Sequence, residues 1–101
     1  MKDEEGVRVY STMDQVEDLK SSIVWNDIVN ELEVWKEGFQ AEQRSMVDDI
    51  ADKNLTTAAV LTHLGDLNGR VKTVDYLINL PDIFLQILED RKNDAKRKRA
   101  D

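Results

Sequence analysis

Few side chains in this chain are suited to acid–base or metal chemistry. His63 is the only histidine, and a catalytic or metal-binding histidine needs partner groups that no motif around it supplies. Asp48, Asp49 and Asp52 gather at the end of a predicted helix and could offer carboxylate oxygens to a divalent cation. They lack the loop and ligand number of a dedicated calcium site, so a solvated acidic face is the favoured interpretation. The chain has no cysteine, which excludes thiol catalysis and cysteine-bound zinc.

Three aromatic residues, Trp25, Trp35 and Phe39, form a stripe that could stack on a cofactor or a nucleobase. Core packing is the commoner cause of such a stripe, because each indole buries a large apolar area. The sequence contains no nucleophile–base pair, glycine-rich phosphate loop or metal-binding motif. It therefore predicts a protein that is not an enzyme and that uses no cofactor and no metal.

The basic C-terminal segment has the strongest functional content. Residues 1–90 carry 8 Lys/Arg and 19 Asp/Glu, a net charge of −11, whereas residues 91–101 carry 6 Lys/Arg and 2 Asp/Glu, a net charge of +4. The six cations are Arg91, Lys92, Lys96, Arg97, Lys98 and Arg99. Such a run can bind a phosphate backbone through counterion release, contact the acidic surface of a neighbouring protein, or simply be a solvated helix end. No aromatic residue is interleaved, so any DNA contact should be weak, non-specific and salt-dependent.

Two apolar stripes define the elements that carry these side chains. Each steps by alternating three and four residues, apart from one step of seven between Phe39 and Met46, which places its members along one seam of a helix. The first consists of Trp25, Ile28, Leu32, Trp35, Phe39 and Met46, and the second of Val60, Leu64, Leu67, Val71, Val74 and Ile78. The spacing predicts an all-α fold, in which helices over residues 22–52 and 57–79 form an antiparallel hairpin with heptad packing. Its turn falls on residues 52–54, and Thr56 or Thr57 can cap the second helix.

Shorter elements flank the predicted hairpin. Thr12 and Gln15 match a capping box and predict a helix over residues 13–20. Ser21 and Ser22 either interrupt that helix or cap the next one. Pro81 interrupts the second long helix, so a third helix should cover residues 81–97. The predicted organisation is a flexible acidic arm (1–11), a helical hairpin domain (12–90) and a basic C-terminal tail (91–101).

Two sets of residues are candidate helix–helix or oligomer interfaces. Gly65 and Gly69 lie four residues apart and off the seam, which favours close approach of another backbone over a break in the helix. The apolar residues of the third helix cover too much of its circumference for one groove within the chain. They are Ile83, Phe84, Leu85, Ile87 and Leu88. We therefore expect a homo-oligomer with the C-terminal helix at its interface.

Membrane association is not expected. No apolar run approaches the roughly 20 residues that cross a bilayer, and the polar, acidic N-terminus differs from a signal peptide. The longest apolar candidate, around residues 77–88, is interrupted by polar residues and by Pro81.

Residues 22–35 and 60–90 together resemble a family of small, mostly uncharacterised helical proteins of tailed bacteriophages, encoded in the head and DNA-packaging gene region. The resemblance implies a non-enzymatic, self-associating structural or accessory component of phage assembly or DNA packaging. It implies other phage structural or packaging proteins as partners, and a location in the host cytoplasm or the virion. Small terminase subunits of the packaging motor form helical rings with DNA-binding elements, but this chain has no convincing N-terminal helix-turn-helix.

Two other functions stay open at the level of sequence. One is a small DNA-binding protein, terminase-small-like or regulatory, that acts through the basic tail. The other is a helical adaptor for a host protein. Salt-dependent DNA binding would distinguish the first from an assembly component, and a stable complex with a host protein would identify the second.

Overall fold

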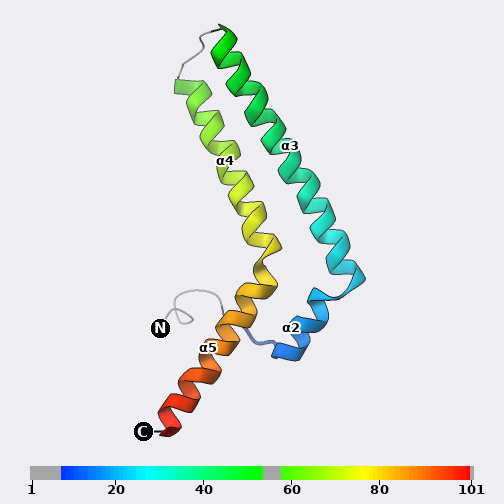
Figure 1. The fold of residues 1–101 in the computed structure, drawn as a ribbon, viewed down its shortest axis with the longest axis vertical. Helices are drawn as coiled ribbons and strands as arrows, with labels where there is room; N and C mark the ends of the chain where they lie inside the picture. Colours follow the sequence, from blue (N-terminus) through cyan, green and yellow to red (C-terminus); the bar gives the residue numbers. More distant parts are fainter. Residues whose placement is uncertain (1–7, 54–57, 101) are drawn as a thin grey trace. The chain divides into compact units, whose positions relative to one another are not determined.

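The regular structure in the described part of the chain is entirely α-helical, which confirms the predicted fold class. The computed structural model describes residues 8–53 and 58–100, except for the side chains of residues 52, 53, 99 and 100. The described residues hold the helices labelled in Figure 1: α2 (Met13–Lys20), α3 (Ile23–Lys53), α4 (Ala58–Ile78) and α5 (Leu80–Ala100). The chain divides into two units, a hairpin unit (Asp27–Ile78) and a terminal unit (Met1–Asn26 with Asn79–Asp101).

Helix α2 begins and ends where its capping residues predict. The Thr12 hydroxyl accepts a hydrogen bond from the backbone N–H of Gln15 at 3.2 Å, and the Gln15 side chain accepts one from the backbone N–H of Thr12 at 2.9 Å. These reciprocal bonds satisfy two backbone donors that a helix N-terminus otherwise leaves unpaired. Ser21 ends α2, and its hydroxyl donates to the carbonyl of Glu17 at 2.9 Å. The predicted helix over residues 13–20 is confirmed.

The serine pair separates α2 from α3. The Ser22 hydroxyl accepts a hydrogen bond from the backbone N–H of Trp25 at 3.0 Å, so Ser22 caps the helix that follows it. Helix α3 then continues through Lys53, which makes the first two residues of the predicted turn helical. The remaining turn residue, Asn54, and the predicted caps Thr56 and Thr57 lie outside the described residues.

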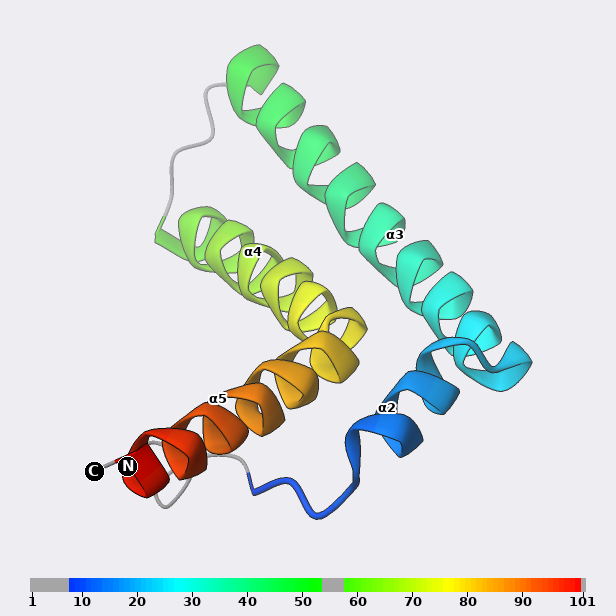
Figure 2. The same cartoon turned by 60° about the horizontal axis from the view of Figure 1, so that its bottom comes forward.

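Helix α4 is one continuous helix in Figure 2, and its range, Ala58–Ile78, includes Gly65 and Gly69. A break at residues 68–69 does not occur. The helix ends at Ile78, and α5 begins at Leu80 with Pro81 in its first turn, where a missing N–H costs no internal hydrogen bond. The backbone carbonyl of Asn79, the residue before α5, accepts a hydrogen bond from the backbone N–H of Ile83 at 3.0 Å. Helix α5 extends to Ala100, so the backbone of the basic segment is helical over residues 91–100.

Helices α3 and α4 form an antiparallel pair in the hairpin unit. The side-chain contacts that join them include Lys36 to Asp75 at 2.7 Å, Phe39 to Arg70 at 5.7 Å from the ring centroid, and Glu42 to His63 at 2.5 Å. As the residue number rises along α3 it falls along α4, which is the order that an antiparallel hairpin requires. Leu32, Leu67 and Val74 are the buried apolar side chains of this unit among the described residues.

The two seams are only partly buried. Trp25, Phe39 and Met46 are half-buried, whereas Ile28 and Trp35 expose 43% and 51% of their surface. The first seam therefore covers a wider arc of α3 than a single neighbouring helix can bury.

The terminal unit brings the two ends of the chain together. Helix α2 packs against α5, and the Lys20 ammonium lies 2.6 Å from the carboxylate of Asp82. The guanidinium of Arg91 donates a 2.7 Å hydrogen bond to the backbone carbonyl of Val9. Val9 and Val16 are buried in this unit.

Candidate assembly surfaces

An open groove of about 560 Å³ runs along one side of the hairpin unit. Helix α3 contributes Trp35 and Phe39 to it, and α4 contributes Gly65, Gly69, Thr73, Val74 and Leu77. We call this surface the Trp35 groove. Its walls are mainly apolar, and half of the Trp35 surface is in contact with solvent.

The two glycines lie in the wall that α4 gives to the groove. A Cβ atom built on Gly65 or Gly69 meets no heavy atom of the described residues within 4 Å, apart from its own helix. The close approach predicted for these glycines is therefore not made within the described chain. Their role at an interface with another molecule stays a prediction.

The polar groups at the edge of the Trp35 groove are held by neighbours in the same unit. Arg70 lies 3.0 Å from the carboxylate of Asp66, one helical turn before it, and its guanidinium covers the ring of Phe39. The indole N–H of Trp35 donates to the carboxylate of Glu31 at 2.9 Å. These contacts fix the orientation of both aromatic rings, so the groove has an ordered rim.

His63 joins the two helices of the hairpin. Its Nε2 atom lies 2.5 Å from an oxygen of Glu42, and both side chains remain exposed. The contact has the geometry of a structural bridge between α4 and α3. Among the described residues, no three His, Cys, Asp or Glu side chains come together as a metal site. Asp48 and Asp49 are exposed on α3, and the side chain of Asp52 lies outside the described residues.

The apolar residues predicted for the C-terminal interface are all half-buried on α5. They are Ile83, Phe84, Leu85, Ile87 and Leu88. None of these five side chains is fully removed from solvent, so each keeps apolar surface available to a further contact. Their place in an oligomer interface stays a prediction.

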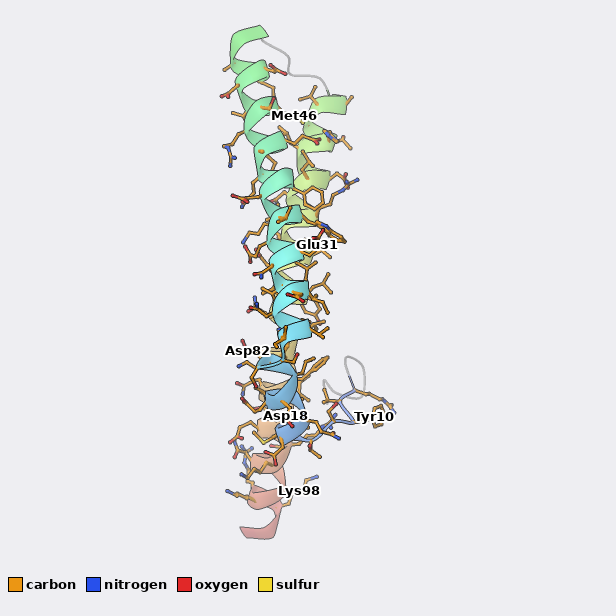
Figure 3. All side chains as sticks on the ribbon, turned by 90° about the vertical axis from the view of Figure 1, so that its right-hand side faces the viewer. Tyr10, Asp18, Glu31, Met46, Asp82 and Lys98 are labelled. Atoms are coloured by element: carbon orange, nitrogen blue, oxygen red, sulfur yellow. The ribbon has the colours of Figure 1, made fainter. Side chains whose placement is uncertain are left out.

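The six cations of the predicted tail do not have equivalent surroundings. Lys92, Lys96, Arg97 and Lys98 are exposed on the last turns of α5, where Figure 3 labels Lys98. Arg97 lies 4.0 Å from the carboxylate of Asp94. Arg91 is half-buried and donates to the Val9 carbonyl, so it belongs to the folded terminal unit. The side chain of Arg99 lies outside the described residues.

Sequence reasoning missed several exposed apolar side chains on α3. Ile23, Val24 and Val34 are exposed by 80%, 67% and 61%. The sequence could have indicated this exposure, because all three are large apolar residues that lie off the heptad seam.

The described helices include none that is both long and apolar enough to span a bilayer. No protein-family model, no curated protein and no solved structure matches this chain.

Proposed function

We propose that this chain is a non-enzymatic, self-associating structural or accessory component of a larger assembly. The single observation that carries the proposal is the amount of apolar surface that the described residues leave exposed. Among the described residues, five side chains form the buried hydrophobic core, whereas ten large apolar ones expose at least 41% of their surface. Contiguous exposed apolar surface marks interaction sites in soluble proteins, and the Trp35 groove concentrates part of it on one face.

The mass of the full chain in solution tests self-association. Light scattering at tens of micromolar protein, at low and near-physiological salt, should give a mass that is a multiple of 11.6 kDa. A mass of 11.6 kDa at both salt concentrations contradicts the proposal.

The setting that we propose is tailed-phage assembly or DNA packaging. Its support is the resemblance of residues 22–35 and 60–90 to small helical phage proteins. Mass spectrometry of purified virions and of head precursors, from a phage that carries the gene, tests this setting. The chain should be found in one of these particles, and its absence from both contradicts a role as a structural component.

A second candidate is DNA binding through the end of α5. The observation that favours it is the exposure of Lys92, Lys96, Arg97 and Lys98, four cations within seven residues. Replacing these four by Gln should abolish DNA retention at low salt, because a few phosphate contacts supply non-specific affinity. Arg91 is kept because it donates a hydrogen bond to the Val9 carbonyl within the terminal unit. A wild-type chain that does not retain DNA at low salt excludes this candidate.

A further inference from the structure

We propose that the Trp35 groove of one copy receives helix α5 of a second copy. This inference rests on the proposed self-association and names the two surfaces that meet. The sequence predicted two candidate interfaces, the glycine pair and the C-terminal helix. In this proposal they are the two sides of a single contact.

Helix α5 carries an apolar and basic face that suits such a contact. Leu85, Leu88, Lys92 and Lys96 are separated by three, four and four residues, so they lie on one side of the helix. The two leucines are half-buried and the two lysines are exposed. This face therefore changes along its length from apolar to cationic.

The Trp35 groove suits this face in its apolar walls and in its length. Trp35, Phe39 and Leu77 give it apolar walls, and Gly65 and Gly69 leave room for another helix. At a rise of 1.5 Å per residue, the stretch of α4 along the groove (65–77) measures about 18 Å and the α5 face (85–96) about 17 Å. The half-exposed indole is the kind of rigid anchor that protein interfaces bury.

Charge identifies a second copy as the occupant. Helix α3 contains eight Asp/Glu and three Lys/Arg, and its Glu31 accepts a hydrogen bond from the indole of Trp35, which lines the groove. Residues 92–98 of α5 contain four Lys/Arg and one Asp. Two α3 surfaces repel each other, as do two α5 ends, whereas α3 and α5 attract. Every copy therefore presents a basic helix end that complements the acidic helix of its neighbour.

This pairing joins two different surfaces of the chain. Two copies that exchange their α5 helices reciprocally form a two-fold dimer, in which the same contact occurs twice. A contact made in one direction only repeats from copy to copy and produces a closed ring or an open filament.

Two variants block the two sides of this contact separately. Gly65→Leu with Gly69→Leu fills the groove, and the fold should tolerate it because leucine favours helix and the glycines have open space. Lys92→Glu with Lys96→Glu reverses the charge of the α5 face. Gly38→Leu and Lys72→Glu are matched controls, because neither residue lines the groove or belongs to that face. Circular dichroism of each variant checks that its helical content is unchanged.

Each blocking variant alone should associate about tenfold more weakly than the wild type, while the controls should not. Mixing the two variants should restore one contact, between α5 of the groove-filled chain and the groove of the charge-reversed chain. Light scattering of the mixture should then detect complexes of two chains and no larger species.

The outcomes separate this inference from the proposed function. A monomeric wild type overturns self-association itself. A wild type that assembles while both blocking variants assemble equally well overturns the use of the groove and of α5, and leaves self-association standing. Two monomeric variants whose mixture stays monomeric overturn the pairing between these two surfaces.

Discussion

The hairpin unit and the terminal unit stay folded through different kinds of contact. In the hairpin unit, α3 and α4 are joined by side-chain contacts spaced along their length, and the Trp35 groove stays open beside them. In the terminal unit, backbone groups take part: a capping box starts α2, and Arg91 binds the carbonyl of Val9. The hairpin unit thus has an uncovered apolar surface. The terminal unit buries Val9 and Val16 and leaves a charged helix end exposed.

The largest effect should come from the core of the hairpin unit. Leu67 is 1% exposed, and Leu67→Ala should lower the free energy of unfolding by about 2–5 kcal/mol through lost apolar burial and a cavity. Leu61→Ala in the same helix is the matched control, because Leu61 is 58% exposed. Urea denaturation followed by circular dichroism measures both. If Leu67→Ala lowers the free energy of unfolding by less than about 1 kcal/mol, the packing of Leu67 does not hold the two helices of the hairpin together.

The backbone contact of the terminal unit gives the next largest effect. Arg91→Ala removes a charged donor from the Val9 carbonyl and should cost about 1.5 kcal/mol. Lys92→Ala, one residue further along α5, should change stability by less than about 0.5 kcal/mol, because Lys92 is exposed. Amide exchange at residues 8–20 should accelerate in the first variant only. Equal exchange in both variants contradicts a structural role for Arg91.

The smallest effect should come from the two lysine–aspartate bridges, one in each unit. The hydrogen bond that Lys20 donates to the Asp82 carboxylate raises the pKa of Lys20, and the one that Lys36 donates to Asp75 raises the pKa of Lys36. A raised lysine pKa means that the bridge stabilises the fold below the unfolded value, about 10.4, and that this contribution is lost as pH rises through the folded value.

The free energy of unfolding, measured at several pH values between about 9 and about 11, tests these bridges. The wild type should lose more stability over this range than Lys20→Met or Lys36→Met, in which the titrating group is absent. All other ionisable groups are the same in the wild type and in each variant, so the difference between them isolates the bridge. An identical loss in the wild type and both variants contradicts a contribution from either bridge.

Local signals explain what could be predicted from the sequence. The bounds of α2 follow from Thr12 and Gln15, which bond to each other across three residues. The interruption between α4 and α5 follows from Pro81, whose ring excludes an unbroken helix. Continuity of α4 through the glycines followed from the unchanged phase of its seam. Each of these features depends on residues within one or two turns of each other.

The remaining features depend on distances between elements, which no local pattern encodes. Arg91 resembled its five cationic neighbours in sequence, and only the packing of the terminal unit places it against Val9, 82 residues away. The exposure of Trp35 likewise depends on how much of the seam α4 covers. The groove arises because the glycines face open space instead of another backbone of the same chain.

The contact between Arg91 and Val9 also sets an order of events during synthesis. Helix α2 is synthesised before the hairpin unit, whereas its packing partner, α5, is synthesised after it. The hairpin unit is a continuous stretch of the chain and can fold before α5 is made, because its contacts close shorter loops. The terminal unit cannot form until α5 has been synthesised. A chain truncated before residue 91 therefore lacks the contact between Arg91 and Val9.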